Sequence, residues 1–265
     1  MQPHSQSDVL RTRVTVLGAP IDALGWDEAL DRTAHWAAER SSRILCFCNV
    51  HSVVTRRDDP ALAAAIDGAD LALPDGMPVA WSMRRAGVSG QPRVDGPGFM
   101  WKFCALAEQR GIGVYFYGST PETLAALRRR LLHAFPDLAF GMESPPFRAL
   151  SAKEDAEAVA RIADSGAGLV FVGLGCPRQE AWMAAHRGRI RAVMAGVGAA
   201  FDYHAGTQSR APLWMQQRGL EWLHRLASEP GRLWRRYLVT NLRFALGMVL
   251  SARRGAVIRL RREPR

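Results

Sequence analysis

The order of apolar and amphipathic segments is the feature that most constrains the fold of this chain. Up to residue 206, short apolar runs of strand length alternate with longer segments in which apolar residues recur at helical spacing. The predicted strands are residues 14–17, 44–48, 71–73, 114–117, 169–172 and 192–195. The predicted helices are residues 26–39, 60–65, 100–109, 121–134, 152–164 and 177–186. This alternation predicts an α/β fold with a Rossmann-like, mainly parallel sheet that is flanked by helices.

The pattern changes after residue 206. From residue 212 onward it is helical, with candidate helices at 212–226, 230–237 and 239–250 and no further strand signal before a basic tail. The charge changes at the same point, because residues 1–206 hold 22 basic and 22 acidic side chains whereas residues 207–265 hold 13 and 3. We therefore predict two domains, an α/β body at 1–206 and a basic helical appendage at 207–265 that meets an anionic partner.

The appendage combines arginine with aromatic and aliphatic residues, which is typical of a helix that lies on a membrane surface. Its longest apolar stretch, of about 14 residues, contains Asn241 and Arg243 and is too short to span a bilayer. Nucleic acid is the competing anion, but the chain has no recognisable nucleic-acid-binding motif. The polar start of the chain lacks a secretory signal, and the four cysteines lack C-x-x-C spacing. We expect a cytoplasmic protein, peripheral on the inner face of the membrane.

Glycine and small or polar residues follow five of the predicted strands, at 49–52, 74–78, 118–120, 173–180 and 196–202. In an open parallel sheet, ligands bind beyond the carboxyl ends of the strands, where backbone N–H groups are presented. These loops suit a phosphate-bearing ligand, although tight turns at the sheet edge are an equally simple interpretation. The dinucleotide fingerprint and the phosphate-loop motif are both absent, which argues against a nicotinamide-dependent oxidoreductase.

Asp75 is the most specific candidate for chemistry, since it stands between a proline and a glycine at a predicted strand end without a neighbouring cation in sequence. It suits a general base. Capping of the following helix is the alternative, and the sequence leaves both open. His51, His186 and His204 show no metal-ligand spacing, and no D-x-D triplet occurs. We therefore expect no metal site and no cofactor.

A series of ordered motifs extends from about Val14 to about Tyr237. The motifs are Asn49, Leu73-Pro74-Asp75-Gly76-Met77-Pro78, Arg93-Val94-x-Gly96, Phe116-Tyr117-Gly118-Ser119, Gly175-x-Pro177-x-Gln179-Glu180-x-Trp182, Gly196-Val197-Gly198-x-x-Phe201-Asp202, and Arg210-Ala211-Pro212 leading to Gly219-Leu220-Glu221-Trp222. Together they resemble the WecG/TagA/CpsF glycosyltransferases. One departure is Phe47, which stands where family members often carry threonine.

The resemblance implies an inverting, metal-independent enzyme that moves a sugar from a UDP-sugar to a polyprenyl-diphosphate-linked saccharide at the cytoplasmic membrane face. The implied sugar is N-acetylmannosamine, its uronate or one of the glucose class, for teichoic acid, enterobacterial common antigen or exopolysaccharide. An anionic membrane surface is the expected macromolecular partner. The sequence leaves open whether the chain also forms a homo-oligomer. The alternative is a non-catalytic nucleotide- or nucleic-acid-binding α/β module with a basic tail.

The resemblance also implies roles for individual residues. Asp75 becomes the general base, and its active-site neighbours are Asn49, Arg93 and Gln179. The implied substrate-binding residues are Tyr117, Gly118, Gly173, Gly175 and Asp202, with Arg225, Arg232 and Arg235 of the appendage holding diphosphate. Without a metal, arginine and backbone N–H groups must stabilise the charge of the departing diphosphate.

Overall fold

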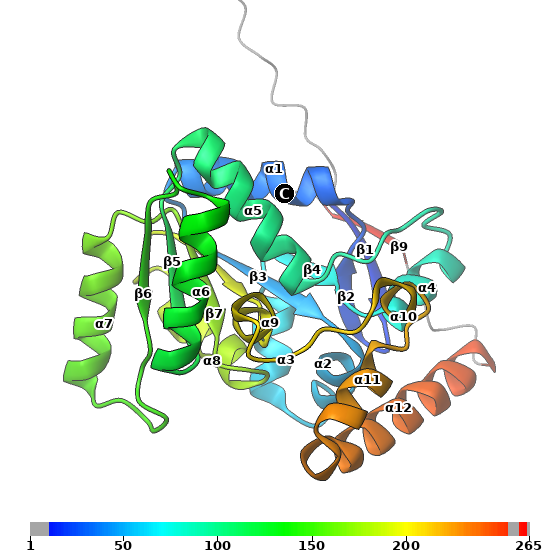
Figure 1. Cartoon of the computed structure of the whole chain (residues 1–265). Coiled ribbons are helices and arrows are strands. Elements are labelled where there is room, and N and C mark those ends of the chain that lie inside the picture. The colour runs from blue at the N-terminus through cyan, green and yellow to red at the C-terminus, as the bar shows by residue number, and fades with distance from the viewer. Residues whose placement is uncertain (1–10, 254–259, 264–265) are drawn as a thin grey trace, which may run out of the picture.

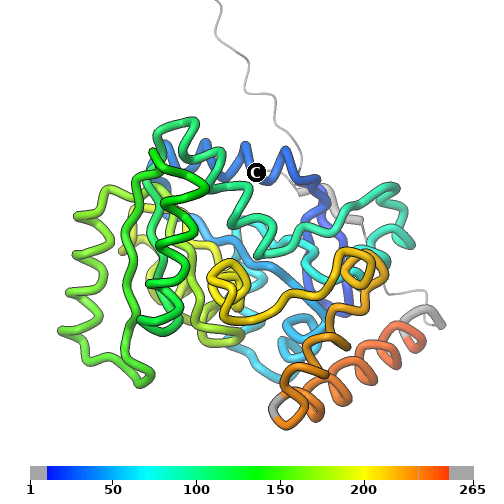
Figure 2. Tube along the Cα trace, viewed as in Figure 1, coloured from blue at the N-terminus to red at the C-terminus, as the bar shows by residue number. Residues whose placement is uncertain are grey.

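The computed structural model describes residues 11–253 and 260–263 of the 265-residue chain, with side chains for 11–250 except residue 232 (Figures 1 and 2). Its centre is a six-stranded sheet in the order β4-β3-β8-β7-β5-β6, in which every neighbouring pair is parallel. The strands are β3 (Arg43–Cys48), β4 (Leu71–Pro74), β5 (Val114–Gly118), β6 (Phe140–Glu143), β7 (Leu169–Gly173) and β8 (Val193–Gly196). The predicted α/β class with a Rossmann-like parallel sheet is confirmed.

Helices cover both faces of this sheet (Figure 1). Residues of α1 (Trp26–Ala38), α5 (Gly96–Arg110), α6 (Pro121–Ala134) and α9 (Ala200–Ala205) share one apolar core, whereas α2 (Val50–Thr55), α3 (Pro60–Asp67), α4 (Met77–Arg85), α7 (Ala152–Asp164) and α8 (Arg178–His186) contribute to the other. Side chains alternate between the two cores along β5, with Phe116 in the first and Tyr115 and Tyr117 in the second. The central strands β7 and β8 are therefore apolar almost throughout, as expected for the part of a sheet that is buried on both faces.

The first predicted strand, residues 14–17, does not belong to the parallel sheet. It corresponds to β1 (Arg11–Val16), which forms an antiparallel hairpin with β2 (Ala19–Asp22). The two residues between them, Leu17 and Gly18, both have positive φ, the conformation of a tight hairpin turn. β9 (Leu260–Glu263) pairs with the other edge of β1, so a strand lies in the basic tail where none was predicted.

Three of the segments that were expected to be loops contain short helices that begin within a few residues of a strand. α2 and α4 begin two and three residues after β3 and β4, and α9 begins four residues after β8. The backbone N–H groups at the starts of these helices therefore lie at the carboxyl edge of the sheet.

After residue 206 the chain forms α10 (Leu213–Gln217), α11 (Glu221–Ser228) and α12 (Pro230–Arg253). The helix predicted at 212–226 is divided by Gly219 at φ +70°, and the two predicted after it are one continuous helix. α12 lies against α2, buries Leu233 and Phe244, and pairs Arg243 with Asp58 of the body. The division into two domains stays a prediction.

Candidate active site

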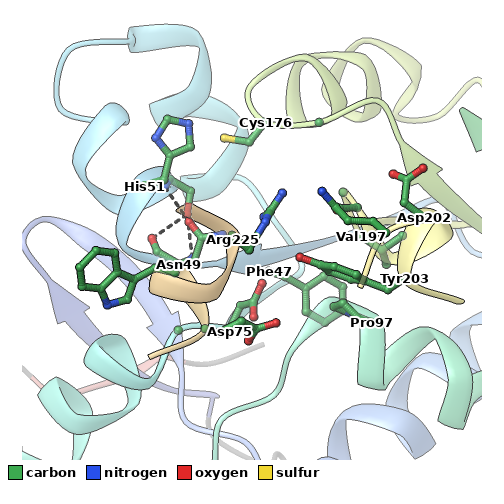
Figure 3. Close-up of a pocket in the computed structure, with 18 of the residues that line it drawn as sticks. Phe47, Asn49, His51, Asp75, Pro97, Cys176, Val197, Asp202, Tyr203 and Arg225 are labelled. Atoms are coloured by element: carbon green, nitrogen blue, oxygen red, sulfur yellow. Dashed lines mark hydrogen bonds between the residues drawn. The ribbon is translucent and has the colours of Figure 1, made fainter. Parts of the chain in front are cut away.

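A cavity of about 1210 Å³ lies at the carboxyl edge of the parallel sheet (Figure 3). Its walls come both from the α/β body and from the helices after residue 206. The body contributes, among others, Phe47, Asn49, His51, Asp75, Arg93, Gly173, Gly175, Gln179, Val197 and Asp202. The later helices contribute Glu221, Trp222, Arg225, Arg236, Tyr237 and Thr240. The structure therefore brings most of the site residues implied by the sequence to one place.

Asn49 lies at the end of β3 and caps α2. Its Oδ1 accepts a hydrogen bond from the Ser52 N–H at 3.1 Å, and the Ser52 hydroxyl accepts one from the Asn49 N–H at 2.9 Å. This capping box fixes the orientation of the amide. Within the described residues the Asn49 Nδ2 donor has no hydrogen-bond partner, so it is available to a ligand in the cavity.

Asp75 follows β4, and it does not cap the next helix: the N-cap of α4 is Gly76, which forms no side-chain cap. The capping interpretation is therefore wrong. Asp75 instead faces Arg93, whose Nη2 lies 3.2 Å from Oδ1 and whose Nε donates to the Asp75 carbonyl. Burial raises the pKa of Asp75 to about 6, and the positive charge of Arg93 only partly opposes that rise.

Arg93 also pairs with a second carboxylate, that of Glu221 at the start of α11. Arg93 Nη2 lies 2.6 Å from Glu221 Oε2, and Glu221 Oε1 lies 3.4 Å from Nε of Arg210. Arg210 in turn pairs with Asp95 at 2.5 Å. Asp75 is thus the end of a chain of alternating charges that extends from the body into the appendage.

Gln179, in the first turn of α8, lines the cavity and binds the loop that follows β8. Its Nε2 donates to the Gly196 carbonyl at 2.9 Å and to Glu180 at 3.0 Å, while its Oε1 accepts from the Gly198 N–H at 3.0 Å. Because both ends of the amide are engaged by the protein, Gln179 holds the loop after β8 in place. The segment 196–198 that it holds lines the cavity.

The predicted glycines divide into two groups. Gly173 and Gly175 line the cavity, and Gly175 has φ +78°. Gly118 is absent from the described cavity wall: it packs on Gly173, where a Cβ would lie 2.6 Å from the backbone. Tyr117 is likewise absent from that wall, because its ring is buried in the core beneath α8 and stacks on Trp182 at 4.6 Å between ring centroids.

Asp202 lies in the first turn of α9 and lines the cavity. Its Oδ1 accepts hydrogen bonds from the hydroxyls of Thr123 at 3.2 Å and Ser119 at 3.4 Å. These contacts fix the position of the carboxylate, which lies at the right of the drawn site, whereas Asp75 lies at the bottom (Figure 3).

Arg225 of α11 and Arg236 of α12 are the cations of the appendage that line the cavity. Arg225 lies over the ring of Tyr203 at 5.8 Å and Arg236 over that of Tyr237 at 5.3 Å. Within the described residues neither guanidinium has an ion-pair partner, and the buried Nε of each has no hydrogen-bond partner. Two desolvated and unpaired guanidiniums indicate a site for an anion.

The other two arginines implied for diphosphate are not placed in this way. Arg235 is exposed and is not among the described residues of the wall. It precedes Arg236 by one position, and consecutive side chains on an α-helix point about 100° apart, so Arg235 points away when Arg236 faces the cavity. Arg232 lies in α12, but its side chain is outside the described part of the structure.

Sequence reasoning gave no role to Arg236, His51 or Glu221. His51 lies in α2, where burial and the nearby Arg236 lower its pKa to about 4. Glu221 belonged to a recognised motif, but its partner Arg93 is 128 positions away in the sequence, so only the fold reveals the pair. Among the described residues no group of three or more His, Cys, Asp or Glu side chains is placed to hold a metal ion. No helix in the described ranges is both long and apolar enough to cross a bilayer.

The parallel sheet, the buried carboxylate and the unpaired arginines together define a Rossmann-like enzyme with a site for an anionic substrate. The profile of the glycosyl transferase WecG/TagA/CpsF family matches residues 14–257. The chain belongs to this family and is a glycosyltransferase. A relative from Bacillus spizizenii strain W23, an N-acetylglucosaminyldiphosphoundecaprenol N-acetyl-β-D-mannosaminyltransferase, is 33% identical over 181 residues, which cover 68% of each chain.

Proposed function

We propose that this protein transfers a sugar from a UDP-sugar to a hydroxyl of a polyprenyl-diphosphate-linked saccharide, with inversion at the anomeric carbon and without a divalent metal. The name of the Bacillus relative supports an acceptor of this class and a donor sugar of the N-acetylmannosamine class. The observation that carries the proposal is that a single cavity holds a largely buried carboxylate, Asp75, together with Arg225 and Arg236, which form no ion pair within the described residues.

Asp75 is the general base of this reaction. A group with a pKa of about 6 is mostly ionised at neutral pH and still accepts a proton readily. The acceptor hydroxyl gives its proton to the Asp75 carboxylate, and its oxygen forms a bond with the anomeric carbon. The bond from that carbon to the phosphate oxygen breaks on the opposite face, and the electron pair leaves with UDP.

Arg225 and Arg236 stabilise the departing diphosphate. Negative charge develops on the bridging oxygen as the glycosidic bond breaks, and guanidiniums that form no ion pair within the described residues are available to it. The backbone around Gly175 and the start of α9 adds N–H donors to the same cavity. The Asp202 carboxylate suits a hydroxyl of the nucleotide ribose, because an ionised carboxylate is an acceptor for such donors.

We further propose that α10, α11 and α12 dock on the cytoplasmic face of an anionic membrane. Several large apolar side chains of these helices are exposed, namely Leu213, Trp214, Trp222, Leu223, Trp234, Leu238, Leu242, Leu246 and Val249. Exposed Arg235 lies among them on α12. Apolar side chains beside arginine and tryptophan favour the interface between lipid headgroups and acyl chains.

The test is UDP release from a panel of UDP-sugars in the presence of a short polyprenyl-diphosphate-linked N-acetylglucosamine. The wild-type protein should release UDP with one donor class and only when the acceptor is present. The Asp75→Asn variant should bind UDP normally and lose about a hundredfold or more in turnover. Asp31→Asn, at an exposed carboxylate on α1, is the matched control and should keep full turnover. A wild-type protein that binds UDP but releases none from any donor would support the non-catalytic module instead.

A further inference from the structure

We infer that Glu221 of α11 is a positioning residue for the reaction, which controls the base Asp75 by competing with it for Arg93. The inference rests on the proposed role of Asp75 and deepens it, because it assigns to the appendage a part in setting the base itself. The sequence motif that contains Glu221 gave this residue no role, and the assignment comes from the contacts that the fold creates.

The competition is for a single nitrogen atom. Arg93 Nη2 lies 2.6 Å from Glu221 Oε2 and 3.2 Å from Asp75 Oδ1. The exposed fractions of the three side chains are 14% for Arg93, 16% for Glu221 and 17% for Asp75. Charges in such a setting interact strongly because little water screens them. The shorter contact belongs to Glu221, so the guanidinium is shared unequally and neutralises Asp75 only in part.

Every described charged group that faces Asp75 is consistent with this role. Arg93 lowers the pKa of Asp75, whereas Asp95 and Glu221 both raise it. Cys48, which lies at the end of β3, has a pKa raised by burial and stays neutral. Arg210 lies behind this group and neutralises Glu221 and Asp95 in part. In this chain of five groups the carboxylates outnumber the guanidiniums by one. The excess negative charge makes Asp75 a stronger proton acceptor.

Glu221 reaches Arg93 only while α11 lies against the body. The same helix carries Arg225 into the cavity. One helix therefore delivers both a cation for the leaving group and the carboxylate that keeps Asp75 basic. A protein whose α11 moved away would lose diphosphate binding, and Arg93 would then pair with Asp75 alone, which makes that base weaker.

The experiment is the pH profile of kcat for three full-length variants, measured by UDP release with the most active UDP-sugar of the panel and the short polyprenyl-diphosphate acceptor. Glu221→Gln keeps the size and the hydrogen-bonding oxygen but removes the negative charge. Its acidic limb should move to lower pH by about one unit, a tenfold change in proton affinity. Arg210→Gln removes the positive charge behind Glu221 and should move the limb in the opposite direction.

Glu157→Gln is the control, since it removes the same charge from an exposed position on α7 that is not part of the described cavity wall. Its acidic limb should coincide with that of the wild type. Shifts of opposite sign in Glu221→Gln and Arg210→Gln support the inference, because a merely structural role would lower kcat without moving the limb. If both limbs stay at the wild-type pH, Glu221 only seats α11 and the inference is overturned.

Failure of the proposed function looks different from failure of this inference. If Asp75→Asn keeps wild-type turnover, Asp75 is not the base, and the inference falls together with that role. If Asp75→Asn is inactive and the limbs of the other variants do not move, the base stands and only the part of Glu221 is refuted. If Glu221→Gln fails to fold, the upward shift expected of Arg210→Gln still decides the question.

Discussion

The substitution Asp75→Asn should make the protein more stable at neutral pH while it removes the proposed general base. The pKa of Asp75 is raised from 3.8 in a model peptide to about 6, chiefly by burial. The native state therefore holds this proton more tightly than the unfolded chain does, so ionised Asp75 destabilises the fold above pH 6. The shift of about two units corresponds to a penalty of up to about 3 kcal/mol at pH 7.5. Asparagine keeps the shape and carries no charge, and it should recover most of that free energy.

The size of the effect depends on pH in a way that tests its cause. As the pH falls through 6 the native Asp75 takes up its proton, and below the unfolded value both states are protonated. The stability gained by Asp75→Asn should therefore be largest at pH 7.5 and small at pH 4. Urea unfolding of wild type, Asp75→Asn and the exposed-site control Asp31→Asn at both pH values measures it. A variant that is less stable than wild type at pH 7.5 would show that Arg93 outweighs burial and that the reasoning is wrong.

Four further predictions concern the reaction and its surroundings. The wild-type kcat should fall about tenfold between pH 7 and pH 5 as Asp75 becomes protonated, and a flat profile over that range would exclude a base with a pKa of about 6. EDTA should leave the initial rate unchanged, and the prediction fails if the chelator abolishes the rate and manganese or magnesium restores it. Arg225→Gln should weaken UDP binding about tenfold or more in calorimetry, whereas exposed Arg235→Gln should not, and equal losses would contradict the assigned anion site. The double variant Trp234→Gln and Leu238→Gln should reduce co-sedimentation with anionic vesicles, and Leu132→Gln on α6 is the control, so an equal reduction in both would refute docking through α12.

The sequence predicted the parts of the fold whose signals are local. The predicted helices 121–134 and 152–164 match α6 and α7 at both ends. Their first residues are marked in the sequence by the capping side chains of Thr120 and Ser151. The hairpin of β1 and β2 was missed because strand patterns do not encode which strand becomes the neighbour. The short helices α2 and α4 were missed because six and nine residues carry too little periodicity to be recognised.

The prediction of the candidate site was limited by geometry that no sequence pattern carries. The rule that ligands bind at the carboxyl edge of a parallel sheet correctly brought Asn49, Asp75 and Gly175 to one cavity. Tyr117 is buried in the core and stacks on Trp182 of α8, so its side chain does not reach the described cavity wall. Arg235 is not in the described cavity wall, because the rotation of about 100° per residue along α12 turns the neighbouring Arg236 toward the cavity.

The distribution of charge along the chain gives the division of labour at this site a physical basis. The first 206 residues contain equal numbers of acidic and basic side chains, and they contribute the proposed base Asp75. The cations proposed for the leaving group, Arg225 and Arg236, come from the strongly basic segment that follows. A diphosphate therefore meets Arg225 and Arg236 only where the appendage lies on the body. If the exposed face of the appendage docks on the membrane that carries the lipid-linked acceptor, then the surface that presents the acceptor also holds the helices that complete the site.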